Sequence, residues 1–143
     1  MTTALVFYEG VMQGSRNRPI MEGFRLAQTL AMSNRLFIAT SGRRDKVERE
    51  LRTERIQDQI VDVLDETDAL PPLLLWQRQI EVVLHRGPLS YLVAADPQIV
   101  EWAVQHGVLS LVFAHPRLNG PPRRPDAGNR SWERLLAELD VRP

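Results

Sequence analysis

The sequence predicts an α/β domain with three layers, in which helices cover both faces of a five-stranded parallel sheet. Three observations lead to this prediction. Five short apolar runs are bounded by turn residues, as buried strands are. The segments between them carry helical patterns that are long enough for parallel crossover connections. The length of 143 residues is sufficient for one domain with its own core.

The composition is that of a globular chain, with 43% hydrophobic and 25% charged residues and no net charge. The net charge therefore does not favour binding to nucleic acid or to a membrane surface. The absence of cysteine excludes disulfides, thiolate metal sites and a cysteine nucleophile. We see no signal peptide and no apolar run long enough to span a membrane, so the expected location is cytoplasmic or virion-associated.

The first predicted strand covers residues 4–7 and breaks at Gly10 into a polar loop. A helix over residues 19–32 follows. Its apolar residues have the spacing of an amphipathic helix that lies on a sheet, and they are Ile20, Phe24, Ala27 and Ala31. Binding and active sites in such sheets lie at the carboxyl ends of the strands, so we expect a functional site at this first loop.

The second predicted strand covers residues 35–39. Asp45 is expected to cap the following helix, which ends near Arg55. This helix is densely charged, and only Val47 and Leu51 clearly face inward. Alternating charges of this kind are typical of a solvated surface helix.

A third, shorter strand is predicted over residues 59–64, and its acidic residue indicates a place near a sheet edge. Two prolines then lead into a helix over residues 73–85. The apolar face of that helix contains Trp76, Ile80 and Val83.

The fourth predicted strand, residues 91–95, is followed at once by Asp96 and Pro97. Aspartate is favoured as a helix N-cap and proline at the first helical position, so a helix begins here and ends at Gly107. The fifth strand covers residues 108–113.

Residues 1–114 therefore form the predicted α/β core, and residues 115–143 form a C-terminal arm and helix. The arm is rich in proline and arginine, and the final helix begins at a serine cap. Arginine and tryptophan are enriched at interface hot spots, so this region is a candidate partner-binding surface. Its candidate residues are Arg117, Arg123, Arg124 and Trp132. The alternative is that the helix packs back onto its own core.

The order and spacing of three short motifs, out of four that mark the family, resemble the haloacid dehalogenase (HAD) superfamily, with the similarity spanning residues 5–113. In that family the first strand ends in an Asp-x-Asp-Gly loop, and here Phe7-Tyr8-Glu9-Gly10 occupies this place with Ser15-Arg16 behind it. The second strand resembles the family in ending at Thr40-Ser41-Gly42-Arg43. The fourth strand ends in an acidic residue, Asp96, as it does in the family.

The departures from the family are chemical. The resemblance implies a nucleophilic carboxylate that also ligates Mg²⁺, but Phe7 stands at that position. Glu9 takes the place of the family's general acid/base aspartate. A lysine is expected before the fourth strand, and the nearest candidates are Gln77-Arg78 and Arg86. Asp96 alone remains from the metal carboxylates, so the expected cofactor is none.

Each remaining polar residue also has a structural interpretation. Asp96 serves as an N-cap, and Glu9 is expected to pair with Arg16 or Arg43. Thr40 and Ser41 could hold a phosphate with the following helix N-terminus. The remnant site is therefore expected to comprise Phe7, Glu9, Ser41, Arg43 and Asp96, with no catalytic residue and no metal ligand among them.

Two functions follow as hypotheses. In the first, the chain is a catalytically inactive HAD-like domain without a cap domain, kept as a protein-binding or structural module. Its partners would be other proteins or further copies of itself, and neither nucleic acid nor a membrane. Small arginine-rich chains without cysteine also resemble HAD-like proteins of actinobacterial tailed phages, which implies a virion, tail or assembly role. In the alternative, an altered constellation supports an Mg²⁺-dependent phosphatase or phosphotransferase, which fold analogy alone favours.

Overall fold

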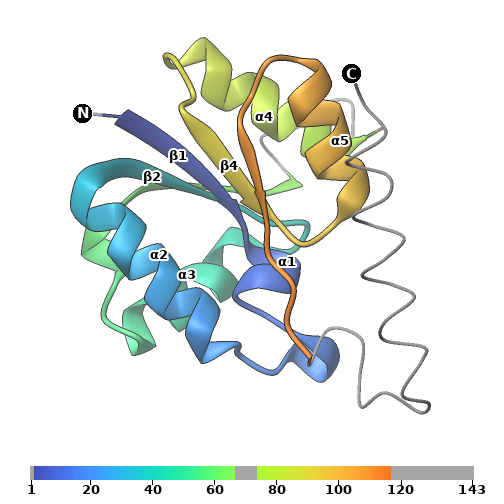
Figure 1. Cartoon of the computed structure of the whole chain (residues 1–143). Coiled ribbons are helices and arrows are strands. Elements are labelled where there is room, and N and C mark those ends of the chain that lie inside the picture. The colour runs from blue at the N-terminus through green and yellow to red at the C-terminus, as the bar shows by residue number, and fades with distance from the viewer. Residues whose placement is uncertain (1, 67–73, 117–143) are drawn as a thin grey trace, which may run out of the picture.

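Helices alternate with parallel strands along almost the whole described chain (Figure 1). The computed structural model describes residues 2–66 and 74–116. The strands are β1 (Thr2–Phe7), β2 (Asn34–Ala39), β3 (Ile60–Leu64), β4 (Tyr91–Ala94) and β5 (Ser110–Val112). The helices are α1 (Tyr8–Val11), α2 (Met21–Ser33), α3 (Arg44–Thr53), α4 (Leu75–His85) and α5 (Pro97–Gln105), with 3₁₀ turns at Ser15–Asn17 and Gln57–Gln59.

The five strands form one parallel sheet in the order β3-β2-β1-β4-β5, which confirms the predicted five-stranded parallel sheet. β1 lies in its centre, where Phe7 pairs with Ala39 of β2 and Val6 pairs with Val93 of β4. β3 lies at one edge, as its acidic residue indicated. This is the strand order of Rossmann-like sheets.

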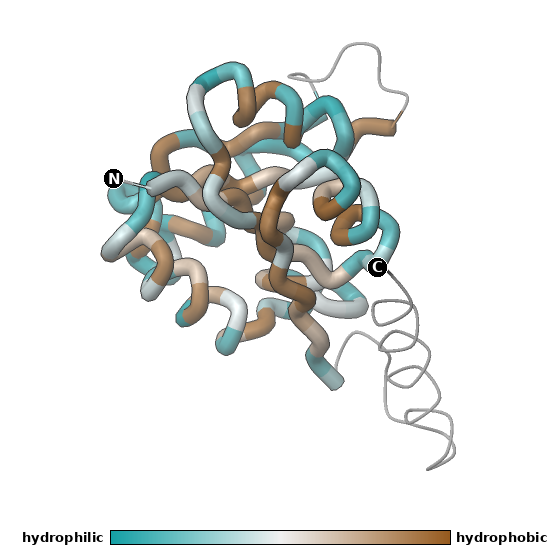
Figure 2. Tube along the Cα trace, turned by 45° about the horizontal axis from the view of Figure 1, so that its top comes forward, coloured by the Kyte–Doolittle hydropathy of each residue, from teal (hydrophilic) through white to brown (hydrophobic). Residues whose placement is uncertain are grey.

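Helices cover both faces of the sheet, with α2 and α3 on one face and α4 and α5 on the other (Figure 1). Alternate side chains of each strand enter one of the two apolar layers. Val6 and Ile38 pack toward α2 and α3, whereas Leu5 and Phe37 pack toward α4 and α5. Figure 2 shows the apolar residues concentrated along the central strands and the hydrophilic residues on the outer turns. Burial of these layers from water supplies the main favourable term for folding.

The N-terminal turn of α2 lies directly against the loop after β1, which includes the short α1, whose Glu9 and Gly10 have non-helical backbone angles. A Cβ atom placed on Gly23 would come within 1.7 Å of the Val11 carbonyl oxygen. Only a residue without a side chain allows this approach, because the obstructing atom belongs to the backbone. Gly23 therefore fixes the distance between α2 and the loop at the carboxyl end of β1.

The cap of α3 differs from the expectation. The N-cap position is Arg43, and Asp45 lies inside the first turn without forming a capping hydrogen bond, so the predicted Asp45 cap is wrong. Instead, the Arg44 amide donates a hydrogen bond of 3.1 Å to the carboxylate of Asp65, which follows β3. A partner 21 residues away in sequence satisfies the helix end, and local spacing carries no sign of it.

The predicted C-terminal arm and helix lie outside the described residues, apart from His115 and Pro116 at the start of the arm. The last described segment leaves β5 and runs toward α2 (Figure 1). His115 there stacks on Phe113, and its Nε2 lies 3.2 Å from the carboxylate of Glu22 in α2. Within residues 2–66 and 74–116, no helix combines the length and the apolar character that crossing a membrane requires.

Candidate functional site

A hollow of about 470 Å³ lies at the carboxyl end of the sheet, next to the point where the strand order reverses between β1 and β4. Ligands of Rossmann-like sheets bind at this switch point. We call it the switch-point hollow and define it by its lining, which consists of Phe7, Glu9, Gly10, Ser41, Leu75, Trp76, Gln79, Ala95, Asp96 and Ile99. Four of the five expected remnant residues, Phe7, Glu9, Ser41 and Asp96, therefore lie together.

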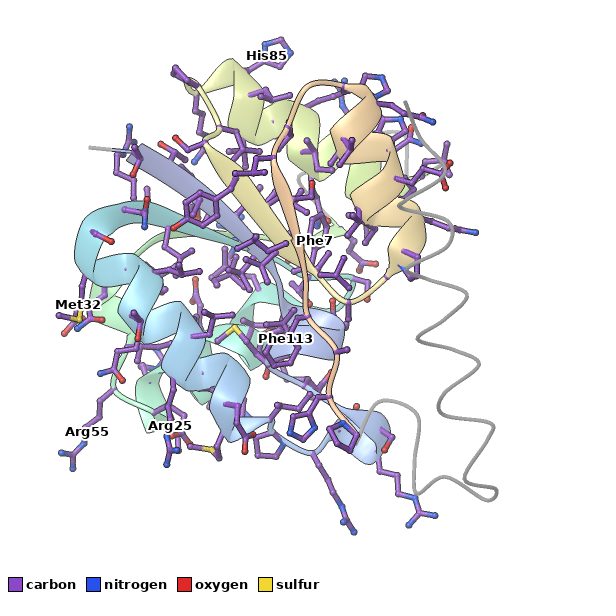
Figure 3. The ribbon with its side chains drawn as sticks, in the orientation of Figure 1. Phe7, Arg25, Met32, Arg55, His85 and Phe113 are labelled. Carbon is purple, nitrogen blue, oxygen red and sulfur yellow. The ribbon has the colours of Figure 1, made fainter. Side chains whose placement is uncertain are left out.

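Phe7 is the last residue of β1 and lies at the centre of the sheet's carboxyl edge (Figure 3). Its side chain is only 5% exposed and belongs to the apolar layer under α4 and α5. The ring carries no lone pair that could attack an electrophile or bind a cation through oxygen. Its role in the hollow is therefore to form an apolar wall.

Glu9 is held by the loop after β2. Its carboxylate accepts a hydrogen bond of 2.6 Å from the Thr40 hydroxyl and one of 2.8 Å from the Ser41 amide. The Thr40 hydroxyl in turn accepts a hydrogen bond from the Gly42 amide at 3.0 Å. Glu9 thus occupies the Thr40 hydroxyl and the Ser41 amide, two of the donors in the loop that was expected to be able to hold a phosphate with the following helix N-terminus.

The expected ion pair between Glu9 and Arg16 or Arg43 is wrong for the described part of the chain. The guanidinium of Arg43 instead lies 3.3 Å from the carboxylate of Asp45, and both side chains are well exposed. Arg43 lines a separate shallow hollow at the start of α3 rather than the switch-point hollow. The charge on Glu9 is stabilised by neutral donors, which the sequence pattern did not indicate.

Asp96 caps α5, as its place before Pro97 predicted. Its Oδ1 accepts a hydrogen bond of 2.9 Å from the amide of Gln98. The side chain is exposed and faces the switch-point hollow. The structural role of Asp96 accounts for one carboxylate oxygen, and the second oxygen accepts no hydrogen bond from the described residues.

Gln79 is a site residue that the sequence analysis missed. It is 1% exposed, and its Nε2 donates hydrogen bonds to the carbonyl oxygens of Thr40 at 2.8 Å and Leu64 at 3.1 Å. These carbonyls lie at the carboxyl ends of β2 and β3, so Gln79 ties α4 to two strand ends. The only sequence signal is a polar residue beside Ile80 on the apolar face of a helix.

The residues considered for the family's lysine do not reach the switch-point hollow. Arg78 pairs with Glu81 at 2.9 Å on the exposed face of α4. Arg86 pairs with Asp62 of β3 at 3.0 Å and lies over the ring of Phe37. Gln77 does not line the hollow either. Its described lining contains no basic side chain.

The donor set does not fit Mg²⁺, which demands a near-octahedral cage of oxygen ligands and dehydrates reluctantly. The hollow offers the carboxylates of Glu9 and Asp96, and each already accepts a backbone amide hydrogen bond. No group of three or more histidine, cysteine, aspartate or glutamate residues suited to a metal occurs within the described ranges.

Tyr8 does not line the hollow, and it is 3% exposed in the apolar layer under α2 and α3. Burial, with smaller contributions from the charges of Glu50 and Glu9, raises the pKa of Tyr8 to about 12. Its ring meets Phe24 of α2 edge to face, with the centroids 6.4 Å apart. Tyr8 is therefore a core residue in its neutral form and supports the loop that carries Glu9.

Comparison of the chain with protein-family models, with curated proteins and with solved structures gave no significant match. The expected partner-binding residues Arg117, Arg123, Arg124 and Trp132 lie outside the described residues. The geometry of the switch-point hollow is therefore the basis for a functional proposal.

Proposed function

We propose that this chain is a HAD-like domain that lacks phosphoryl transfer and acts as a protein-binding or structural module. The observation that carries the proposal is the apolar wall formed by Phe7 at the end of the central strand. Covalent phosphoryl transfer needs a nucleophilic oxygen at that point. An aromatic ring cannot supply one.

The hydrogen bonds of Glu9 and the charge of the hollow support the same proposal. Glu9 already accepts hydrogen bonds from Thr40 and Ser41, so a substrate phosphate would have to compete with an internal anion for these donors. No lysine or arginine lines the described hollow, which removes the charge that phosphoryl transfer usually requires.

The alternative function is Mg²⁺-dependent phosphate chemistry that uses Glu9, Ser41 and Asp96. Metal-dependent chemistry of this kind would have to use Glu9 oxygens that already accept hydrogen bonds from Thr40 and Ser41, and Asp96 would offer its Oδ2 oxygen, because Oδ1 already accepts from the Gln98 amide. The partner in the favoured proposal is another protein or a second copy of the chain. The phage resemblance seen in the sequence implies a virion or assembly protein as the class of partner.

A phosphatase assay distinguishes the two functions. The purified chain is incubated with Mg²⁺ and p-nitrophenyl phosphate beside a Glu9→Gln, Asp96→Asn double variant. Asparagine keeps an acceptor oxygen for the Gln98 amide, and glutamine keeps one of the two acceptor oxygens of Glu9. We expect no turnover by either protein above a blank without protein. Metal-dependent turnover that the double variant loses would overturn the proposal.

A further inference from the structure

We propose that the switch-point hollow binds an arginine side chain presented by a partner protein. This inference rests on the proposed function and names the chemistry of the partner. The hollow combines apolar and aromatic walls with two carboxylates among its lining residues.

The walls suit the stem and the plane of a guanidinium side chain. Phe7, Trp76 and Ile99 face the hollow from β1, α4 and α5. An edge-to-face contact with Trp102, with the ring centroids 5.8 Å apart, orients the Trp76 ring. Tryptophan is the strongest aromatic partner for a cation, and arginine also stacks flat on aromatic rings. The methylene stem of arginine packs well on apolar surface.

The charge of the hollow is complementary to a cation. Glu9 and Asp96 contribute carboxylates, and no described residue of the lining is basic. Residues 67–73, which precede α4 in the sequence, contain no basic residue either. The Oδ2 oxygen of Asp96 accepts no hydrogen bond from the described residues, so it remains an acceptor for a guanidinium N–H.

Arginine fits this combination better than the other charged or aromatic side chains. A phosphate or carboxylate would face two carboxylates and no basic side chain. Lysine offers a compact, strongly hydrated ammonium without a planar surface to stack on Trp76. A neutral aromatic side chain would fill the apolar part but would leave Asp96 without a charged partner.

The test uses n-butylguanidinium as the probe and n-butylurea as its neutral isostere, each titrated into the full chain and followed by NMR. We expect saturable shifts of the Trp76 indole N–H and the Ser41 amide. The amide of Leu51 in α3, on the other face of the sheet, does not line the hollow and serves as the internal reference. The guanidinium probe is expected to bind about tenfold more tightly than the urea, because its hydrogen bonds are charge-assisted.

Three variants assign the binding to the hollow. Asp96→Asn keeps the helix cap but removes the charge, and we expect it to weaken guanidinium binding about tenfold. Trp76→Leu removes the stacking surface and is expected to weaken binding as well. Asp45→Asn removes an exposed carboxylate outside the hollow and should leave binding unchanged.

The three candidate partner-binding arginines of the chain's own arm present the same chemistry, so an Arg117→Gln, Arg123→Gln, Arg124→Gln triple variant is titrated in parallel. Saturable, guanidinium-selective binding in either form supports the proposal. Equal binding of probe and urea, unchanged binding in Asp96→Asn, or no saturable shift in both forms would overturn it. If the titrations give one of these overturning results and the phosphatase assay shows no turnover, this inference alone is overturned and the proposed function stands. Turnover in the phosphatase assay overturns the proposed function itself.

Discussion

The Glu9 carboxylate and the Thr40 hydroxyl are joined by a hydrogen bond of 2.6 Å across the carboxyl ends of β1 and β2. Thr40 is 1% exposed, so this bond lies in a region largely shielded from water. It places a fixed negative charge where a substrate anion would otherwise find its donors. The same bond connects the two loops that border the switch-point hollow.

Removal of the Thr40 hydroxyl should therefore destabilise the chain. In Thr40→Val the carboxylate of Glu9 and the amide of Gly42 both lose a partner, and we expect unfolding to become easier by about 2 kcal/mol. Urea denaturation measures this change. Thr40→Ser is the matched control because it keeps the hydroxyl, and it should lose less stability than the valine variant. A valine variant as stable as the parent chain would contradict the role given to this bond.

Gly23→Ala should be among the most damaging small substitutions in the chain. The added methyl group would meet the Val11 carbonyl at 1.7 Å, so α2 or the Glu9 loop must move. We expect a loss of about 3 kcal/mol, at the upper end for overpacked sites. Gly42→Ala is the control, because its Cβ would lie 3.5 Å from the nearest atom, the Thr40 hydroxyl oxygen. Equal melting temperatures for the two variants would refute the close approach.

Gln79→Leu tests the link between α4 and the strand ends. The substitution keeps the approximate size but leaves the carbonyls of Thr40 and Leu64 without this donor in a buried position. We expect a loss of about 2 to 3 kcal/mol in the free energy of unfolding. Gln105→Leu, on the exposed surface of α5, should change it by less than about 0.5 kcal/mol. Comparable losses in the two variants would show that the Gln79 bonds contribute nothing specific.

Alkaline pH should destabilise the chain through Tyr8. Its pKa is about 12 in the folded state, against about 10 in an unfolded chain. The folded state therefore keeps the proton that the unfolded state loses between these pH values, and stability falls as pH rises from 10 to 12. We expect Tyr8 to contribute up to about 2 kcal/mol to this fall. The Tyr8→Phe variant should lack this contribution to the fall in stability between pH 10 and 12. Urea denaturation at several pH values measures it, and a variant with the same pH profile as the parent chain would contradict the role given to Tyr8.

The sequence predicted the sheet well because apolar runs and helix caps are local. The cap formed by Asp96 is an example, since Asp followed by Pro specifies a helix start without reference to the rest of the fold. The burial of β1 also followed, because a short apolar run that enters a loop is typical of a buried strand. These features depend on neighbours within a few residues.

Features that depend on distant contacts could not be predicted in this way. Glu9 found its donors on the loop after β2, 31 and 32 residues away, and not on a nearby arginine. The cap of α3 came from Asp65, and Gln79 reached two strand ends from a helix whose pattern emphasised its apolar residues. Hydrogen-bond partners of this kind are decided by tertiary packing, which a single sequence does not encode in its spacing.

The most direct test of the central claim is a search for a phosphorylated form of the chain. The protein is incubated with acetyl phosphate and Mg²⁺, quenched in acid and measured by intact-protein mass spectrometry. Because Phe7 lines the hollow where a nucleophile would be needed, we predict that the mass stays that of the unmodified chain. A mass increase of one phosphoryl group, localised to Glu9, Ser41 or Asp96, would contradict the account.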